Sequence, residues 1–139
     1  MKFSELTEAQ WQENGMYYDT CLLPVTGLTG GGNPLETTTA LEKLADAIDL
    51  IEQPFKGRVV IYPACHYWGA EDKPMLERLC SELKRSAGFK YVILVSAIHL
   101  PLPGTEQADL VVIPDQDGKL PPASEVREKV MQCWTRNNG

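Results

Sequence analysis

The chain has 139 residues, a formal net charge of −6 at pH 7 and 43% hydrophobic residues. This length suits one domain with a buried core, and the composition is typical of a globular protein. The acidic balance argues against nucleic acid or an anionic membrane as a partner. No apolar run is long enough to span a bilayer, and the first residues lack the apolar segment of a signal peptide. We therefore expect a single cytoplasmic domain over residues 1–139, with neither nucleic acid nor a membrane as its partner.

The cysteines argue against a metal centre. Cys21, Cys65, Cys80 and Cys133 form no Cys-x-x-Cys pair, which a zinc finger or a thioredoxin-type motif would require. Buried free thiols are the ordinary alternative, and they suit a reducing cytosol. The sequence thus predicts no metal and no cofactor.

The chain opens with a short helix and a buried strand. Thr7 starts a capping box with Gln10, and Gly15 ends this first helix. A continuous apolar run over 21–25 is typical of a strand that is covered on both faces. Pro24 lies within this run and has no N–H for a β-ladder, so we expect the strand to end near it or to need no donor there.

A glycine-rich loop and a long helix follow. The loop contains four glycines that allow close backbone approach, namely Gly27, Gly30, Gly31 and Gly32. Asn33 is a good N-cap residue, Pro34 suits the first helical position, and Glu36 can reach back toward the cap. The helix is predicted to run to about residue 53. Its inward stripe at helical spacing consists of Leu41, Leu44, Ala45, Ile48 and Ile51.

The step from strand to glycine loop to helix resembles the anion sites of many proteins, where helix amides bind phosphate. From Gly27 to Gly32 the spacing fits a P-loop, but Asn33 and Pro34 stand where Lys and Ser or Thr are needed. Three interpretations stay open for this loop: a structural turn with a helix cap, a site for a small carboxylate or phosphate, and a nucleotide site.

Three more strands are predicted, over 58–62, 91–96 and 110–113. A helix is expected between 72 and 88, a proline-rich loop over 97–107 and a turn-rich loop over 115–122. The last helix is expected from Ser124 onward, followed by a frayed end over 137–139. Its inward positions are Val126, Val130, Cys133 and Trp134.

Strands that alternate with helices predict an α/β fold of three layers, with a four-stranded, mostly parallel sheet and helices on both faces. The first and third strands should be central, because their apolar runs are continuous. The link between the third and fourth strands is short, whereas a parallel crossover usually carries a helix. An antiparallel or irregular last strand is therefore an open alternative.

Ligands of open α/β sheets bind at the carboxyl ends of the strands. The candidate ligand-binding residues at these ends are Thr26, Gly30, Gly31, Gly32, Asn33, Cys65, His66, Trp68 and His99. The loops 27–33 and 65–68 should lie side by side, because successive strands joined by one helix are usually neighbours. The glycines would offer backbone amides, while Tyr67 and its neighbours would offer side chains. The expected partner is a small anionic or polar ligand, with a protein partner or a homodimer as alternatives.

The same edge suggests an enzymatic alternative. His66 with Cys65 or Asp115 could form a hydrolase site, since histidine is a base near neutral pH. Ordinary roles compete with this, because a histidine after a strand is commonly a hydrogen-bonding loop residue and Asp115 is a turn former. A Gly-x-Ser-x-Gly nucleophile motif is absent from the sequence. A non-catalytic binding domain is therefore the leading hypothesis.

Several short motifs resemble one bacterial family. They are Phe-Ser-Glu-Leu-Thr at 3–7, Tyr-Asp-Thr at 18–20 before the strand that ends at Pro24, and Gly-Arg-Val at 57–59 before Tyr-Pro-Ala at 62–64. With these motifs the chain resembles the YpiF-like family, small proteins of Gram-positive spore formers with no established activity. The resemblance implies a small cytosolic protein and assigns no catalytic residue.

A second, local resemblance starts at the first strand. The matching positions are Pro24, Val25, Gly32, Leu35 and Thr39. They are similar to the opening motif of the creatininase family of metal-dependent amidohydrolases. That family has a Glu, two His and an Asp within the motif, where this chain has Thr29, Gly31, Pro34 and Ala40. Since these metal ligands are missing and the chain is much shorter, the resemblance does not imply a dinuclear hydrolase.

Overall fold

The computed structural model describes residues 1–102 and 107–136. The frayed end expected over 137–139 and part of the proline-rich loop expected over 97–107 lie outside the described residues. The strands are β1 (Thr20–Leu28), β2 (Val59–Ile61), β3 (Cys65–Tyr67), β4 (Tyr91–Val95) and β5 (Leu110–Val112). The α-helices are α1 (Glu8–Asn14), α2 (Pro34–Glu52), α3 (Lys73–Arg85) and α4 (Ala123–Arg136). Short 3₁₀ turns cover Phe3–Glu5, Gln53–Phe55 and Ala70–Asp72.

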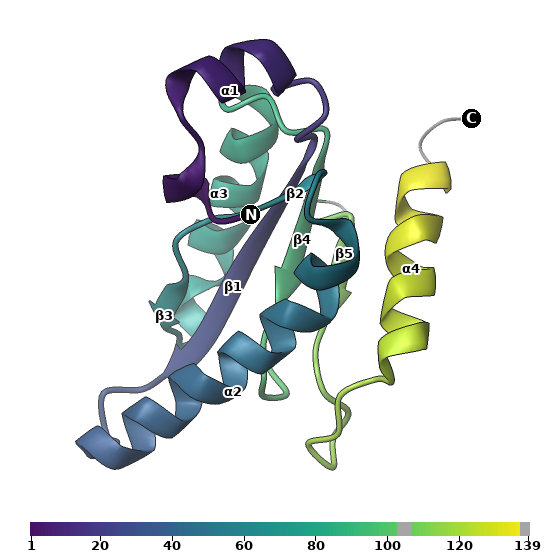
Figure 1. The fold of residues 1–139 in the computed structure, drawn as a ribbon. Helices are drawn as coiled ribbons and strands as arrows, with labels where there is room; N and C mark the ends of the chain where they lie inside the picture. The colour runs from purple at the N-terminus through teal and green to yellow at the C-terminus, as the bar shows by residue number, and fades with distance from the viewer. Residues whose placement is uncertain (103–106, 137–139) are drawn as a thin grey trace.

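The strands form one sheet in the order β2-β1-β4-β5, with β3 also paired to β1 (Figure 1). Every pair is parallel. The four expected strands are present, and the prediction that the first and third are central is confirmed by the positions of β1 and β4. Because β5 runs parallel to β4, the antiparallel alternative for the last strand is wrong.

The described residues contain a fifth strand, β3, where the sequence analysis expected a loop. Pro24 explains the division between β2 and β3, because alternate residues of β1 face this edge strand and Pro24 has no N–H to donate to it. β1 itself continues past Pro24 to Leu28. The Tyr62 N–H still donates to the Leu22 carbonyl oxygen at 2.9 Å, and the Trp68 N–H donates to that of Leu28 at 3.0 Å. β2 and β3 are therefore two segments of one interrupted edge strand.

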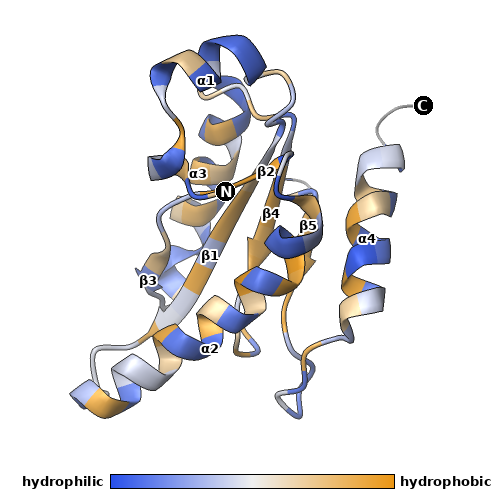
Figure 2. Cartoon of the chain, viewed as in Figure 1, coloured by the Kyte–Doolittle hydropathy of each residue, from blue (hydrophilic) through white to orange (hydrophobic). Residues whose placement is uncertain are grey.

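Helices cover both faces of the sheet, as predicted, and each face has its own core. On one face, Cys21, Leu23 and Val25 of β1 pack with the α3 stripe. On the other face, Leu22 packs with α2 and α4. Figure 2 shows the apolar strands between helices in which apolar and polar residues alternate. The inward residues predicted for α4 are buried there: Val126, Val130, Cys133 and Trp134.

The first half of α2 extends past the carboxyl end of the sheet (Figure 1). α2 has 19 residues and is about 28 Å long, and none of its first ten residues is buried. Leu44, Ala47 and Ile51 are its buried residues. The predicted inward stripe is therefore wrong at Leu41, which is 40% exposed, and at Ala45, which is also exposed.

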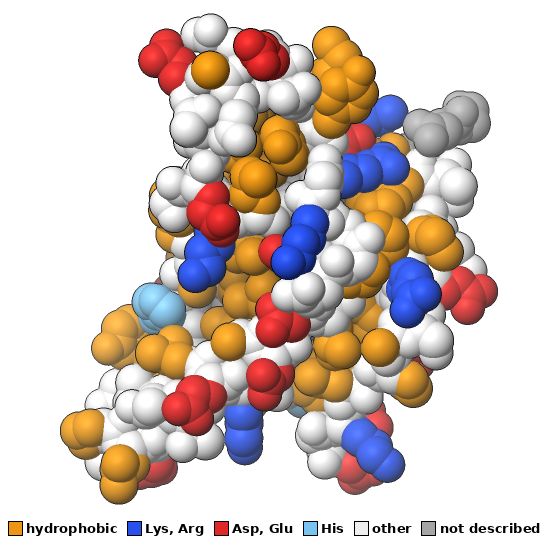
Figure 3. Space-filling view, viewed as in Figure 1, with side chains coloured by type: hydrophobic (Ala, Val, Ile, Leu, Met, Phe, Trp, Pro, Cys, Tyr) orange, Lys and Arg blue, Asp and Glu red, His pale blue; other side chains and the backbone are white. Residues whose placement is uncertain are grey.

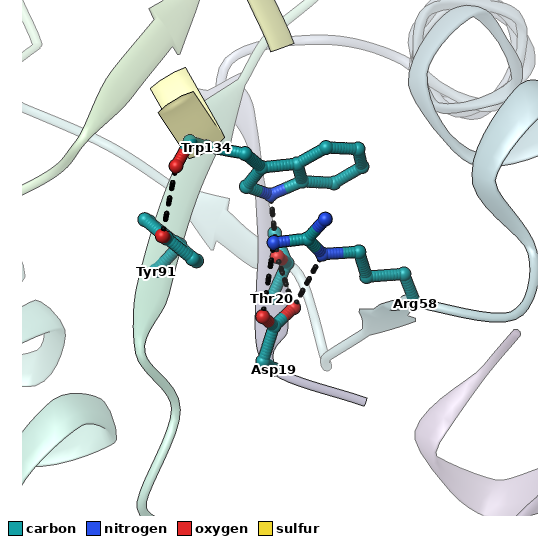
Figure 4. A network of polar contacts seen from close by, with 5 residues as sticks. All are labelled: Asp19, Thr20, Arg58, Tyr91 and Trp134. Atoms are coloured by element: carbon teal, nitrogen blue, oxygen red, sulfur yellow. Dashed lines mark hydrogen bonds and ion pairs between the residues drawn. The ribbon is translucent and has the colours of Figure 1, made fainter. Parts of the chain in front are cut away.

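At the amino end of the sheet, a polar network attaches α4 to β1 and β4 (Figure 4). Trp134 Nε1 donates to the Thr20 hydroxyl at 2.9 Å, and the Tyr91 hydroxyl donates to the Trp134 carbonyl oxygen at 3.1 Å. Arg58 forms two hydrogen bonds with the Asp19 carboxylate, at 2.8 and 3.1 Å. These contacts join α4 and the start of β1 at the amino end of the sheet.

Candidate functional site

β1 and β3 end side by side at the carboxyl edge of the sheet. Leu28 pairs with Tyr67 in the parallel register, so the loop after β1 starts next to the loop after β3. The expected adjacency of the loops 27–33 and 65–68 is confirmed. It follows from the topology, since one helix joins β1 to the interrupted edge strand that pairs with it.

A hollow of about 420 Å³ lies in this corner. It is lined by Gly27, Leu28, Thr29, Gly30, Gly31, Gly32, Glu36, Thr37 and Tyr67. Gly27 and Gly30 have φ values of 85° and 88°, a conformation that glycine adopts without strain. Four of the nine lining residues are glycines, whose backbone a ligand can approach closely.

The start of α2 closes one side of the hollow. The Asn33 side chain accepts a hydrogen bond from the Glu36 N–H at 2.9 Å, and a Glu36 carboxylate oxygen accepts one from the Asn33 N–H at 3.3 Å. The predicted capping box is therefore formed. It also brings a carboxylate to the hollow, which opposes the attraction of the helix dipole for anions.

Thr26 and His66 meet on the strands behind the loops. The Thr26 hydroxyl and His66 Nδ1 are 2.9 Å apart. The Thr26 side chain is buried, whereas His66 is exposed. This hydrogen bond orients the imidazole and leaves its Nε2 directed away from the threonine.

Cys65 and His66 face opposite sides of the sheet. Cys65 packs against the core on the α3 face, and successive strand residues point to opposite faces, so His66 faces the other way. Burial raises the pKa of the Cys65 thiol above its ordinary value, which lowers the thiolate population that a nucleophile needs.

Trp68 lies in the core rather than over the loop, with 8% of its surface exposed. It packs with the α3-side cluster. Tyr67, which is 67% exposed, lines the hollow in its place. The sequence could not separate these two aromatics, because they are neighbours at the end of β3 and no periodic pattern shows which of them faces inward.

His99 and Asp115 lie elsewhere on the carboxyl end. His99 Nδ1 donates to the Pro114 carbonyl oxygen at 2.9 Å, and Asp115 accepts the N–H groups of Asp117 and Lys119, each at 2.9 Å. Asp115 therefore forms the predicted turn. It follows β5, three strand spacings or about 14 Å across the sheet from β3, so His66 and Asp115 are not brought together.

Two further hollows continue the surface beyond the glycine loop. One of about 340 Å³ is lined by Leu35, Glu36, Thr39, Ala40, Lys43 and Ile98. The other, of about 560 Å³, shares Lys43 and Ile98 with it and reaches His99 and Asp117. Sequence analysis missed Lys43 and Ile98; the periodicity of α2 could have indicated the first, whereas Ile98 is placed only by the tertiary structure.

Apolar side chains are exposed around these hollows. The exposed fractions are 79% for Leu35 and 42% for Ile98, both of which line the smaller hollow. Figure 3 shows hydrophobic side chains at the end of the molecule where α2 begins. The carboxyl end is thus both hollowed and partly apolar, as binding surfaces commonly are.

In the described part of the chain, no group of three or more His, Cys, Asp or Glu side chains is arranged to hold a metal ion. Within the same residues, no helix combines the length and apolar character needed to cross a membrane.

The comparisons with known proteins identify a family. No curated protein and no solved structure matches the chain. A family model described as a protein of unknown function, DUF2487, matches residues 9–114. This match covers β1 to β5 and both loops of the glycine hollow, and therefore most of the fold. The chain belongs to the DUF2487 family of proteins of unknown function.

Proposed function

We propose that this protein is a non-catalytic binding domain that receives a small polar ligand in the hollow between the glycine loop and Tyr67. The observation that supports this most is the position of the hollow. It lies where two adjacent parallel strands end, the place where open α/β sheets bind their ligands. Its glycine-rich lining suits hydrogen bonds to hydroxyl or amide groups.

The lining favours a neutral ligand over an anion. Amides at a helix start attract anions, but here the Glu36 carboxylate lines the hollow and already accepts the Asn33 N–H. An anion would have to approach this carboxylate, which costs electrostatic energy. Of the expected ligand classes, we therefore propose the polar one rather than the anionic one.

The hydrolase alternative has less support. It needs His66 beside a nucleophile or an orienting acid. Cys65 faces the opposite side of the sheet, and Asp115 follows the strand at the other edge. His66 does contact Thr26, which orients its ring, but it is not among the residues that line the hollow.

Nuclear magnetic resonance of the ¹⁵N-labelled protein tests the proposal. The probes are glucose and acetamide as neutral ligands, and acetate and inorganic phosphate as anions. We expect saturable shifts of the Gly30, Gly31 and Gly32 amide resonances with a neutral probe, and smaller shifts with either anion. A loop that responds to none of these probes would contradict the proposal.

Two glycine substitutions provide the matched comparison. A Cβ at Gly31 would lie 3.5 Å from Thr29 Oγ1, an ordinary contact, so Gly31→Ala should fold normally while narrowing the hollow. Gly57 is another loop glycine, with no atom within 4 Å of an added Cβ. We expect Gly31→Ala to weaken probe binding several-fold and Gly57→Ala to leave it unchanged. Equal affinities in the two variants would count against the site.

We further infer that the protein belongs to the YpiF-like group and works in the cytoplasm of a spore-forming bacterium. The motifs at 3–7, 18–20 and 57–64 support the first inference, and the four free thiols support a reducing compartment. The likeness to the creatininase opening is best explained as a similar strand, loop and helix start without metal chemistry.

A further inference from the structure

The first turns of α2, which extend past the sheet, have one face that lines a groove. This face carries both polar and apolar side chains. Glu36, Thr39, Ala40 and Lys43 follow one another at the i, i+3, i+4 and i+7 spacing of a single helix face. Together with Leu35 and Ile98 they line the hollow of about 340 Å³. The tertiary structure leaves this face open, since the buried residues of α2 begin at Leu44.

Two residues of opposite charge are placed symmetrically on this face. Glu36 and Lys43 stand at its two ends, at equal distances along the helix from a midpoint between Thr39 and Ala40. The two residues at the midpoint are small, so another helix can approach the backbone closely there. A face of this kind is complementary to itself when the second helix runs in the opposite direction.

We propose that this face binds a second copy of the chain through an antiparallel α2–α2 contact across a two-fold axis near Thr39 and Ala40. In such an isologous contact each interaction occurs twice. Glu36 of one copy lies opposite Lys43 of the other, which gives two reciprocal ion pairs. Thr39 lies opposite Ala40, which allows the close approach.

The apolar residues beside the face fit the same arrangement. Ile98 lines the groove together with Lys43, and Leu35 is adjacent to Glu36. When Glu36 of one copy meets Lys43 of the other, Leu35 is therefore brought next to the second copy's Ile98. The contact buries two strongly exposed apolar side chains on each copy, at 79% and 42% exposure in the isolated chain.

A further electrostatic contact follows from the helix direction. Asp46 lies one turn beyond Lys43 and lines the neighbouring hollow with it. In the antiparallel arrangement, Asp46 falls opposite Asn33 at the start of the other α2. A carboxylate near a helix N-terminus is favoured by the helix dipole. The pairing thus matches charges at both ends of the shared face.

The contact is small, because it involves about three turns of one helix and the loop at Ile98. Interfaces below about 1,200 Å² are typical of transient association. The dimer is therefore expected to form with a dissociation constant in roughly the micromolar to millimolar range, so that the oligomeric state depends on protein concentration.

Analytical ultracentrifugation of the full chain, from about 10 μM to about 1 mM, tests the proposal. We expect a reversible monomer–dimer equilibrium for the wild type. Lys43→Glu places two glutamates opposite each other in both pairs, and we expect it to weaken the dimer by about tenfold. Adding Glu36→Gln to that variant removes the repulsion and should restore most of the affinity, because glutamine retains the capping-box geometry.

Lys56→Glu is the matched control, because it makes the same charge change on an exposed residue beyond the far end of α2. It should leave the dimer unchanged, whereas Thr39→Arg at the midpoint should abolish it. Circular dichroism spectra that match the wild type would show that each variant is folded. A protein that stays monomeric throughout, or equal effects of Lys43→Glu and Lys56→Glu, would overturn the proposal and leave the groove to a different partner.

Discussion

Trp134 attaches the last helix to the sheet through three kinds of contact. Its indole N–H donates to the Thr20 hydroxyl at 2.9 Å, and its ring meets Phe55 edge-on at 4.7 Å between centroids. The Arg58 guanidinium lies 3.7 Å from the centroid of the indole ring, a cation–π contact. Because all of these groups are held together at the amino end of the sheet, the residue should be important for stability.

Trp134→Phe is expected to lower the free energy of unfolding by about 2 kcal/mol, because it removes a buried hydrogen bond and part of the ring volume. Urea denaturation measures this change. Trp11→Phe is the matched control, since the Trp11 side chain is 40% exposed and should contribute less than about 1 kcal/mol. Equal losses of unfolding free energy in the two variants would show that the hydrogen bond from Trp134 to Thr20 adds no measurable stability.

The end of β1 depends on a single glycine. Gly27 has a φ of 85°, and a Cβ there would lie 2.6 Å from Ile98 Cδ1. Both the backbone conformation and the space therefore require glycine. Gly27 lies within β1, where the register with β3 shifts between Val25 and Leu28, and Ile98 packs against it at the edge of the groove beside α2.

Gly27→Ala is expected to destabilise the protein by about 2 kcal/mol, because the left-handed conformation is strained for alanine and the methyl group displaces Ile98. Gly57→Ala, where the space is open, should stay within about 1 kcal/mol of the wild type. Thermal unfolding followed by circular dichroism compares the two variants. If Gly27→Ala melted at the same temperature as the wild type, the backbone at this position would accommodate alanine without strain.

Local patterns predicted most of these elements. The continuous apolar runs located β1 and β4 at the centre of the sheet, because burial on both faces leaves no polar alternation. β3 could not be predicted in this way. Its three residues, Cys65–Tyr67, have no apolar pattern. They pair with β1 because the chain resumes the course of the edge strand beyond the break opposite Pro24.

The site was predictable in its place but not in its lining. The topology of parallel strands brought the loops after β1 and β3 together, as expected. Which side chains face the hollow depends on local geometry. The Trp68 side chain is buried in the core, whereas that of Tyr67 is exposed. Leu41 is exposed because the first half of α2 extends past the end of the sheet. Neither outcome is encoded in a periodicity of the sequence.

Considered as a whole, the molecule keeps thiols in both of its cores. Cys21 and Cys80 lie on the α3 face and Cys133 on the opposite face. Burial raises the pKa of Cys80 and of Cys133 from 9.0 to about 11, and it also raises the pKa of Cys21. The folded protein therefore holds these protons at a pH at which the unfolded chain releases them.

This difference predicts loss of stability at high pH. Below pH 9 the thiols are protonated in both states, and their contribution to stability is complete. Between about pH 9 and 11 the unfolded chain binds fewer protons, so the free energy of unfolding should fall by roughly 1 kcal/mol or more per pH unit. Urea denaturation from pH 7 to 11 measures the slope.

Cys133→Ala provides the control for this pH dependence. The variant is less stable at every pH because of the lost volume, but its decline above pH 9 should be shallower than that of the wild type, since one titrating group is gone. An unchanged slope would assign the decline to other groups.

The interrupted edge strand also affects how the sheet can meet other chains. Exposed strand edges are templates for edge-to-edge aggregation, and short or proline-broken edges suppress it. Here β5 has three residues, and the opposite edge is divided opposite Pro24 into two segments of three. The outer side of β2 is further occupied by the backbone at Lys2, which bridges to Ile61. Both edges are thus poor templates for amyloid-like stacking.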